Sequence, residues 1–207
     1  MFQFSLLCAP RAVRLHTIRT IMHKVFVYGT LKRDEPNHYW LTDENNGVGN
    51  FLTDGHTKTQ YPLIIATKYN IPFLLFSPGD GHLVKGEIYE VDDNMLHKLD
   101  MLEDHPNYYV REKDKIVIST QVSEDTETET TVQCWVYFLK NFKPELLDRP
   151  HLESYSSKGP HGLPYMDRSK RDPLYNHKSE IKPDIQPEII KPVDNPDNKK
   201  PDTDPAP

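Results

Sequence analysis

The segment VFVYGTLKR, residues 25–33, gives the clearest indication of the fold. Its β-branched and aromatic residues predict a buried strand, and Gly29, Thr30 and Leu31 predict a tight turn after it. Backbone N–H groups in such a turn lack strand partners, so they can bind a carbonyl or carboxylate oxygen of a ligand. Gly29 has no Cβ and lets a ligand approach the main chain closely. An ordinary strand end without a ligand is the alternative interpretation.

The composition narrows the class of protein. The 207 residues include 25 Lys and Arg and 31 Asp and Glu, which gives a net charge of −6. This balance argues against a general nucleic-acid-binding protein, and no apolar run is long enough to span a membrane. Cys8 and Cys134 lie far apart, and no metal-binding motif is present. We therefore expect a cytoplasmic monomer with two free thiols and no metal or other cofactor.

Composition also divides the chain into three parts. Residues 1–22 carry three arginines and no acidic residue, which is typical of a mitochondrial transit peptide. The alternative is an extension upstream of a start at Met22. Residues 169–207 contain eight prolines and mixed charges, so we expect a disordered tail that buries too little apolar surface to fold. The folded domain is expected at residues 23–168.

The pattern within this domain predicts several strands and two helices. Apolar or alternating runs predict strands at residues 25–31, 61–66, 71–76, 83–91, 108–120 and 132–139. Pro62 and Pro72 favour edge positions for the second and third of these strands. Asn37 is expected to cap a short helix that ends near Leu41. The acidic, Thr-rich segment at 123–131 is expected to be a solvated loop.

A second helix is predicted from the sequence DDNMLHKLDMLED at residues 92–104. Asp92 or Asp93 can cap its first turn. Successive side chains of a helix are about 100° apart around its axis, so the apolar side chains of this helix fall in one sector. They are Met95, Leu96, Leu99 and Leu102. Glu103 points into the same sector. The sequence therefore places one carboxylate on the buried face, at the C-terminal end of this helix.

Burial and the helix dipole would both raise the pKa of Glu103. A carboxyl group with a raised pKa is a candidate general acid or base, because a buried Glu is rare unless it is paired or functional. Pairing with Arg111 or Lys113 is the structural alternative, and so is an outward-facing side chain at a frayed helix end.

Several blocks, in their order and spacing, resemble the γ-glutamylcyclotransferase fold family and most closely its γ-glutamylamine subgroup. The blocks are VFVYGTLKR at 25–33, PNH at 36–38, YPLI at 61–64, NIPFLL at 70–75, GHLVKGEIYEVDDNML at 81–96, LDMLE at 99–103 and SYSSKGPHGLPY at 154–165. The resemblance implies an α+β fold, a small mixed β-barrel with helices packed around it.

The resemblance also implies an activity and a site. The expected reaction converts γ-glutamyl-ε-lysine, a product of transglutaminase crosslink breakdown, to 5-oxoproline and free lysine without a cofactor. The loop of Tyr28, Gly29, Thr30 and Leu31 would hold the γ-glutamyl group of this small-molecule substrate. Glu103 would transfer the proton, and Tyr109 matches an aromatic residue near the site. The GPHG turn at 159–162 is expected at the rim of the site or in a lid.

Two other functions are compatible with these residues. The first is a cyclotransferase for γ-glutamyl amino acids or glutathione, which product analysis would distinguish. The second is a non-catalytic module that binds γ-glutamyl ligands or a protein partner, although an inactive relative is expected to lack the carboxylate at Glu103.

Overall fold

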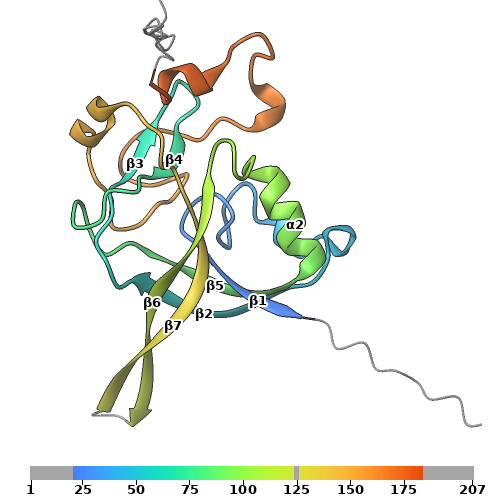
Figure 1. Ribbon diagram of the computed structural model, residues 1–207, viewed down its shortest axis with the longest axis vertical. Helices are drawn as coiled ribbons and strands as arrows, with labels where there is room; N and C mark the ends of the chain where they lie inside the picture. Colours follow the sequence, from blue (N-terminus) through green and yellow to red (C-terminus); the bar gives the residue numbers. More distant parts are fainter. Residues whose placement is uncertain (1–20, 124–125, 184–207) are drawn as a thin grey trace, which may run out of the picture.

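The computed structural model describes residues 21–123 and 126–183 (Figure 1). Predictions for residues 1–20 and 184–207 lie outside the described residues. The strands are β1 (Met22–Val27), β2 (Gly49–Thr57), β3 (Leu63–Ala66), β4 (Ile71–Leu74), β5 (Lys85–Asp92), β6 (Val110–Ser123) and β7 (Thr126–Phe138). The α-helices are α1 (Tyr39–Thr42) and α2 (Asp93–Leu102), and the 3-10 helices are η1 (Glu44–Asn46), η2 (Pro144–Asp148), η3 (Arg168–Lys170) and η4 (His177–Glu180).

Five strands close into a barrel in the order β1-β5-β2-β6-β7. Four of the pairings are antiparallel, and the parallel pairing of β1 with β7, at Val25 and Trp135, closes the barrel. The short strands β3 and β4 pair with each other in a separate antiparallel sheet. The expected α+β fold with a small mixed barrel is thereby confirmed.

The last three residues of strand β1, 25–27, are buried on both faces, which explains why they are all apolar. Val25 and Val27 belong to the apolar cluster that includes the buried face of α2. Phe26, between them, belongs to a second cluster with Ile88 and Val136 from other barrel strands. Burying one such side chain contributes about 1.5–3 kcal/mol. This packing fixes α2 against β1 and brings the C-terminal end of the helix close to the turn that follows the strand.

Helix α2 forms as the sequence predicts. Asp92 caps it, because its side chain accepts a 2.8 Å hydrogen bond from the N–H of Met95. The four apolar residues of the predicted sector, Met95, Leu96, Leu99 and Leu102, are all buried. The other predicted cap is wrong. The short helix α1 has His38 at its N-cap, and Asn37 uses its side chain elsewhere.

The sequence-based predictions were wrong at two places in the barrel. Strand β2 was not predicted, because its sequence GNFLTDGHT buries only Thr57 and has no clear apolar alternation. Its pairing with β5 on one side and β6 on the other holds it in place. Residues 126–131, which were expected in a solvated loop, belong to β7, and β6 extends to Ser123. Backbone hydrogen bonds between β6 and β7 continue through their polar residues, so both strands are longer than their apolar runs predicted.

The folded region extends past the expected limit at residue 168. The side chain of Ile181 is fully buried in the cluster that contains the α2 face. Its carbonyl accepts a 2.8 Å hydrogen bond from the N–H of Lys143. Helices η3 and η4 lie on this segment, near β3 and β4 (Figure 1). The prolines and charges suggested a tail, but one apolar side chain anchors the segment.

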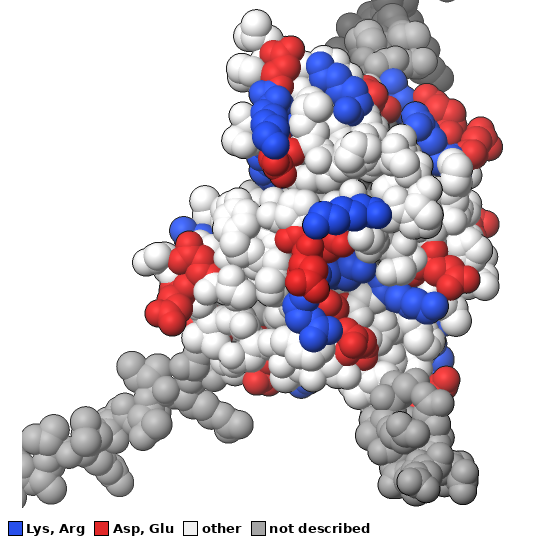
Figure 2. Space-filling view, turned by 180° about the vertical axis from the view of Figure 1, so that it is seen from behind, with Lys and Arg blue, Asp and Glu red and all other residues white. Residues whose placement is uncertain are grey.

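The surface carries charges of both signs. Figure 2 shows Lys and Arg side chains interspersed with Asp and Glu side chains over one face. Among the described residues, no helix is both long enough and apolar enough to cross a membrane.

Candidate active site

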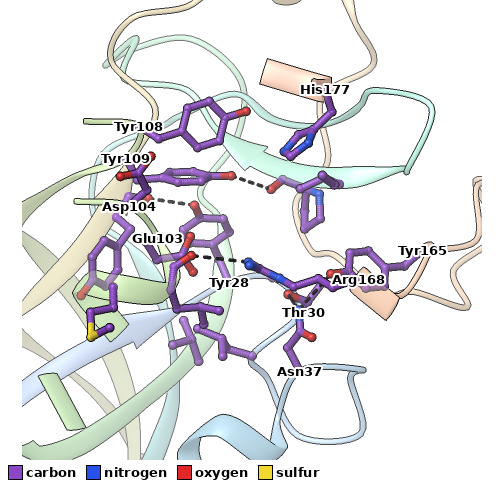
Figure 3. Close-up of a pocket in the computed structure, with 18 of the residues that line it drawn as sticks. Tyr28, Thr30, Asn37, Glu103, Asp104, Tyr108, Tyr109, Tyr165, Arg168 and His177 are labelled. Atoms are coloured by element: carbon purple, nitrogen blue, oxygen red, sulfur yellow. Dashed lines mark hydrogen bonds between the residues drawn. The ribbon is translucent and has the colours of Figure 1, made fainter. Parts of the chain in front are cut away.

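A pocket of about 350 Å³ opens where the turn after β1 meets the C-terminal end of α2 (Figure 3). The structure brings together at this pocket all six residues that the sequence nominated. They are Tyr28, Gly29, Thr30, Leu31, Glu103 and Tyr109. The GPHG turn at 159–162 is not part of the pocket wall. His161 instead packs on Tyr155 and hydrogen-bonds the carbonyl of Ser156 at 2.7 Å, so its role is structural.

The turn after β1 presents free backbone donors. The carbonyls of Gly29 and Thr30 accept hydrogen bonds from the N–H groups of Lys32 and Asn37, at 3.2 and 2.9 Å. Within the described part of the chain, the N–H groups of Gly29, Thr30 and Leu31 donate to no protein acceptor. Three consecutive unpaired amides beside a pocket can bind an oxygen that carries negative charge.

Asn37 holds this turn in shape. Its side-chain amide donates to the hydroxyl of Thr30 at 2.9 Å and to the hydroxyl of Tyr165 at 3.0 Å. It thus connects the turn to the opposite wall of the pocket. Sequence reasoning gave Asn37 only a capping role, because its true partner, Tyr165, is 128 residues away.

Glu103 sits at the end of α2, where the helix closes in a Schellman motif. The N–H of Asp104 donates to the carbonyl of Met101, and the N–H of His105 donates to the carbonyl of Asp100. Asp104 adopts the left-handed conformation that this motif requires, with φ of 52°. The chain therefore reverses directly after Glu103, and this reversal fixes the carboxyl group at the pocket.

The surroundings of Glu103 change its acidity. Burial raises the pKa of Glu103 to about 7, and the nearby Arg168 guanidinium limits the rise. The side chain is only partly exposed, because one side opens on the pocket and protein surrounds the rest. A carboxyl group with a pKa of about 7 can both take up and release a proton near neutral pH.

The tyrosines around Glu103 direct their hydroxyl groups elsewhere. Tyr28 donates to the carbonyl of Tyr137 at 2.8 Å, and Tyr109 donates to the carbonyl of Pro72 at 3.4 Å. Burial raises the pKa of both hydroxyls well above the usual value, so they remain protonated. These side chains shape and desolvate the pocket. Within the described residues, none of their hydroxyls donates a hydrogen bond to the Glu103 carboxyl.

Neither of the structural partners considered for Glu103 contacts it. Arg111 forms an ion pair with Asp100 at 3.3 Å. The ammonium group of Lys113 lies over the ring of Trp135, 5.1 Å from its centroid. Among the described side chains, no cation forms an ion pair with Glu103, so its carboxyl is available to a ligand.

One wall of the pocket was missed by sequence reasoning. It is formed by residues 164–181, which we call the strap, and the strap residues that line the pocket are Tyr165, Arg168, Arg171, His177 and Lys178. The strap is tied down by hydrogen bonds of 3.0 Å from the N–H of Met166 to the carbonyl of Tyr69 and of 2.8 Å from the side chain of Asn70 to the carbonyl of Pro164. Its composition gave no signal of this role.

The described residues contain no cluster of three His, Cys, Asp or Glu side chains that could hold a metal ion. The absence of a cofactor therefore stays a prediction from the sequence.

Comparison with known proteins agrees with the fold. Residues 25–157 match the family model described as gamma-glutamyl cyclotransferase, AIG2-like. Gamma-glutamylaminecyclotransferases of Mus musculus and Homo sapiens are 47% and 46% identical to this chain, over 72% of its length and all of theirs. The crystal structure of a Mus musculus AIG2-like protein has a TM-score of 0.66 and 46% identity, and the match covers 72% of this chain and 99% of that one. The chain belongs to the AIG2-like gamma-glutamyl cyclotransferase family.

Proposed function

We propose that this protein is a γ-glutamylamine cyclotransferase that converts γ-glutamyl-ε-lysine to 5-oxoproline and free lysine. One observation carries the proposal: Glu103, with a pKa of about 7, shares a small pocket with three unpaired backbone amides. The names of the relatives, which are gamma-glutamylaminecyclotransferases, support the amine-releasing reaction.

The reaction is an intramolecular displacement. The α-amino nitrogen of the glutamyl group attacks its own γ-carbonyl carbon, and a new C–N bond closes a five-membered lactam. The bond from the same carbon to the ε-nitrogen of lysine then breaks, and the lysine amine leaves. No water is consumed, and no covalent bond to the protein forms. The site must therefore fold the substrate, bind the charge on the carbonyl oxygen and allow two protons to pass from the attacking nitrogen to the departing one.

Glu103 moves the first of these protons in this mechanism. An α-ammonium group has a pKa of about 8, so a carboxylate with a pKa of about 7 can remove its proton at little cost. The same carboxyl group then protonates the departing ε-nitrogen and is regenerated. The attacking nitrogen loses its second proton as the lactam forms, and the released lysine amine, which is more basic than the α-amine, takes up a proton to become an ammonium group. General acid–base transfer of this kind contributes about 10²- to 10⁴-fold to a rate.

The amides of Gly29, Thr30 and Leu31 bind the γ-carbonyl oxygen, on which negative charge develops during the attack. Fixed amide donors stabilise such an oxyanion more effectively than water does, because they need not reorganise during the reaction. The surrounding tyrosines keep water out and strengthen these interactions.

The direct test is product analysis with the purified full-length chain. Incubation with γ-glutamyl-ε-lysine should release 5-oxoproline and lysine in equal amounts. Glutathione, which would release 5-oxoproline and cysteinylglycine, should be turned over at least about tenfold more slowly. Faster turnover of glutathione would assign the protein to the γ-glutamyl amino acid cyclotransferases. Binding of 5-oxoproline without turnover of either substrate would favour the non-catalytic module.

A further inference from the structure

The strap places two arginines at the pocket, and the family match at residues 25–157 ends before both of them. Arg171 has partners in the protein. Its guanidinium lies over the rings of Tyr69 and Tyr165, 5.1 Å from each centroid, and its Nε donates to the carbonyl of Met166. Arg168 is different. Within the described residues its guanidinium makes one weak hydrogen bond, of 3.5 Å, to the carbonyl of Leu102.

The acidic side chains nearest in sequence to Arg168 and Glu103 are already paired. Asp104, beside Glu103, binds the ammonium group of Lys178. Asp167, beside Arg168, binds Lys170 at 3.0 Å. No ion pair to Arg168 occurs in the described part of the chain. A guanidinium carries five N–H donors in a planar fork that suits a carboxylate, so Arg168 has unused capacity to bind one.

Arg168 and Glu103 reach into the same pocket from opposite walls. Figure 3 shows Arg168 extending toward the C-terminal end of α2, where its guanidinium donates to the carbonyl of Leu102, the residue before Glu103. Arg168 is close enough to influence the charge of Glu103, yet their nitrogen and oxygen atoms are farther apart than the 4.0 Å of an ion pair. The space between them thus has a cation on one side and a carboxylate on the other.

This arrangement complements an α-amino acid group, which carries an ammonium and a carboxylate on the same carbon atom. The ammonium group fits beside Glu103, as proton transfer requires. The carboxylate, which is only two bonds from the nitrogen, must then lie close to it, on the side of Arg168.

We propose that Arg168 binds the α-carboxylate of the substrate's γ-glutamyl group and thereby positions the α-amino nitrogen at Glu103. This inference rests on the proposed function. The hydrogen bonds that anchor Tyr165 and Met166 hold Arg168 at the pocket before the substrate arrives. A site prepared in this way loses little conformational entropy on binding.

The inference defines the substrate class more narrowly. A free α-carboxylate is required in addition to a free α-amine, so a glutamyl residue that is still in a peptide chain cannot bind productively on either side. The substrate must therefore be supplied by peptide-bond hydrolysis on both sides of the crosslinked glutamyl residue. The protein would act after proteolysis is complete, on small isopeptides.

The test pairs a protein variant with a substrate variant. Arg168→Gln removes the cation, and the α-carboxamide analogue of γ-glutamyl-ε-lysine removes the carboxylate. With the normal substrate, Arg168→Gln should raise KM about 10- to 100-fold, the range for a lost charge-assisted hydrogen bond, and lower kcat less. With the carboxamide analogue, wild type and Arg168→Gln should have similar KM values. Arg168→Lys should recover part of the affinity, because it keeps the charge but not the planar fork.

The matched control is Lys170→Gln. Lys170 lies on the same 3-10 helix and carries the same charge, but it pairs with Asp167 and does not line the pocket. This variant should have wild-type kinetics. A second readout is the pH profile. Removing the guanidinium should move the acidic limb of kcat/KM to higher pH, because Arg168 holds the pKa of Glu103 down.

The outcomes separate the inference from the proposed function. Wild-type protein without turnover of γ-glutamyl-ε-lysine would refute the function. Wild-type turnover with equal effects of Arg168→Gln on both substrates, or with no effect on either, would refute the inference alone. Calorimetry measures ligand affinity and therefore tests the inference without depending on turnover. Wild type should bind 5-oxoproline at least tenfold more tightly than 2-pyrrolidinone, the same lactam without its carboxylate, and Arg168→Gln should lose this preference. A preference that survives in Arg168→Gln would place the carboxylate at the turn amides and overturn the inference.

Discussion

Replacing Glu103 by Gln removes the proton carrier while preserving the size of the side chain. Turnover of γ-glutamyl-ε-lysine should fall by at least about 10²-fold, the lower end of general acid–base contributions. The affinity for 5-oxoproline should change little, because the turn at 28–31 is intact. Initial rates of 5-oxoproline release and calorimetry with 5-oxoproline measure the two effects.

The same substitution has a signature in stability. Folding raises the pKa of Glu103 from 4.5 to about 7, so the native state binds this proton more tightly than the unfolded state does. The carboxyl group therefore costs no stability below pH 4.5, and its cost grows as the pH rises to about 7. At about 1.4 kcal/mol per pH unit, the full cost has an upper limit of about 3 kcal/mol. Glu103→Gln should thus gain about 2 kcal/mol more at pH 8 than at pH 5.

Urea denaturation of both proteins at pH 5 and pH 8 measures this difference. Glu90→Gln is the control, because Glu90 lies on β5 and is not part of the pocket wall. It should show neither the loss of turnover nor the pH-dependent gain. Lower stability of Glu103→Gln at pH 8 together with normal turnover would show that the carboxylate has a structural partner and would refute the mechanism.

Three further substitutions test the walls of the pocket. Gly29→Val should lower kcat/KM strongly, because even a Cβ at this position would lie 3.1 Å from Cγ of Pro72 and the branched side chain would fill the site; Thr30→Ser, which keeps the hydroxyl, should be mild in the same assay. Asn37→Ala should raise KM and lower the free energy of unfolding by about 1–2 kcal/mol, since it removes the two hydrogen bonds from its side chain; unchanged kinetics would show that the turn needs no support from the strap. Ile181→Ala should cost about 2–5 kcal/mol in urea denaturation, because the side chain is fully buried, and a cost under 0.5 kcal/mol would mean that the domain ends near residue 168 after all.

The parts of the structure that sequence could predict are those whose cause is local. A short run of β-branched and aromatic residues forms the buried end of β1, and a 3.6-residue apolar period with an Asp cap forms α2. The same period placed Glu103 on the buried side without any knowledge of its neighbours. The turn at Gly29 was predicted because a strand that stops at Gly-Thr must leave amides unpaired. Each of these inferences needs only residues that are adjacent or a few positions apart.

The parts that sequence could not predict depend on partners far away in the chain. Strand β2 has few apolar residues, and it forms a strand because its backbone pairs with β5 on one side and β6 on the other. Asn37 looked like a helix cap because Ser, Thr, Asp and Asn are the usual caps, but its amide finds Tyr165 instead. The strap has the composition of a disordered segment, and its fold depends on one buried Ile and a few backbone hydrogen bonds to other elements.

In the proposed site, the residues that would act on the reacting atoms are those predicted from local sequence, and the residue that would recognise the substrate is one that depends on distant partners. The turn amides and Glu103, which would act on the reacting atoms, come from elements that are specified locally and packed rigidly. The cation that would select the substrate, Arg168, lies on a segment that tertiary contacts alone hold in place. A change in the strap is therefore expected to weaken binding of the γ-glutamyl group more than it slows the proton transfer, whereas a change in α2 or β1 would destabilise the barrel. If the proposed roles are correct, relatives with a different strap sequence should keep the counterpart of Glu103 and differ in KM and substrate preference more than in kcat.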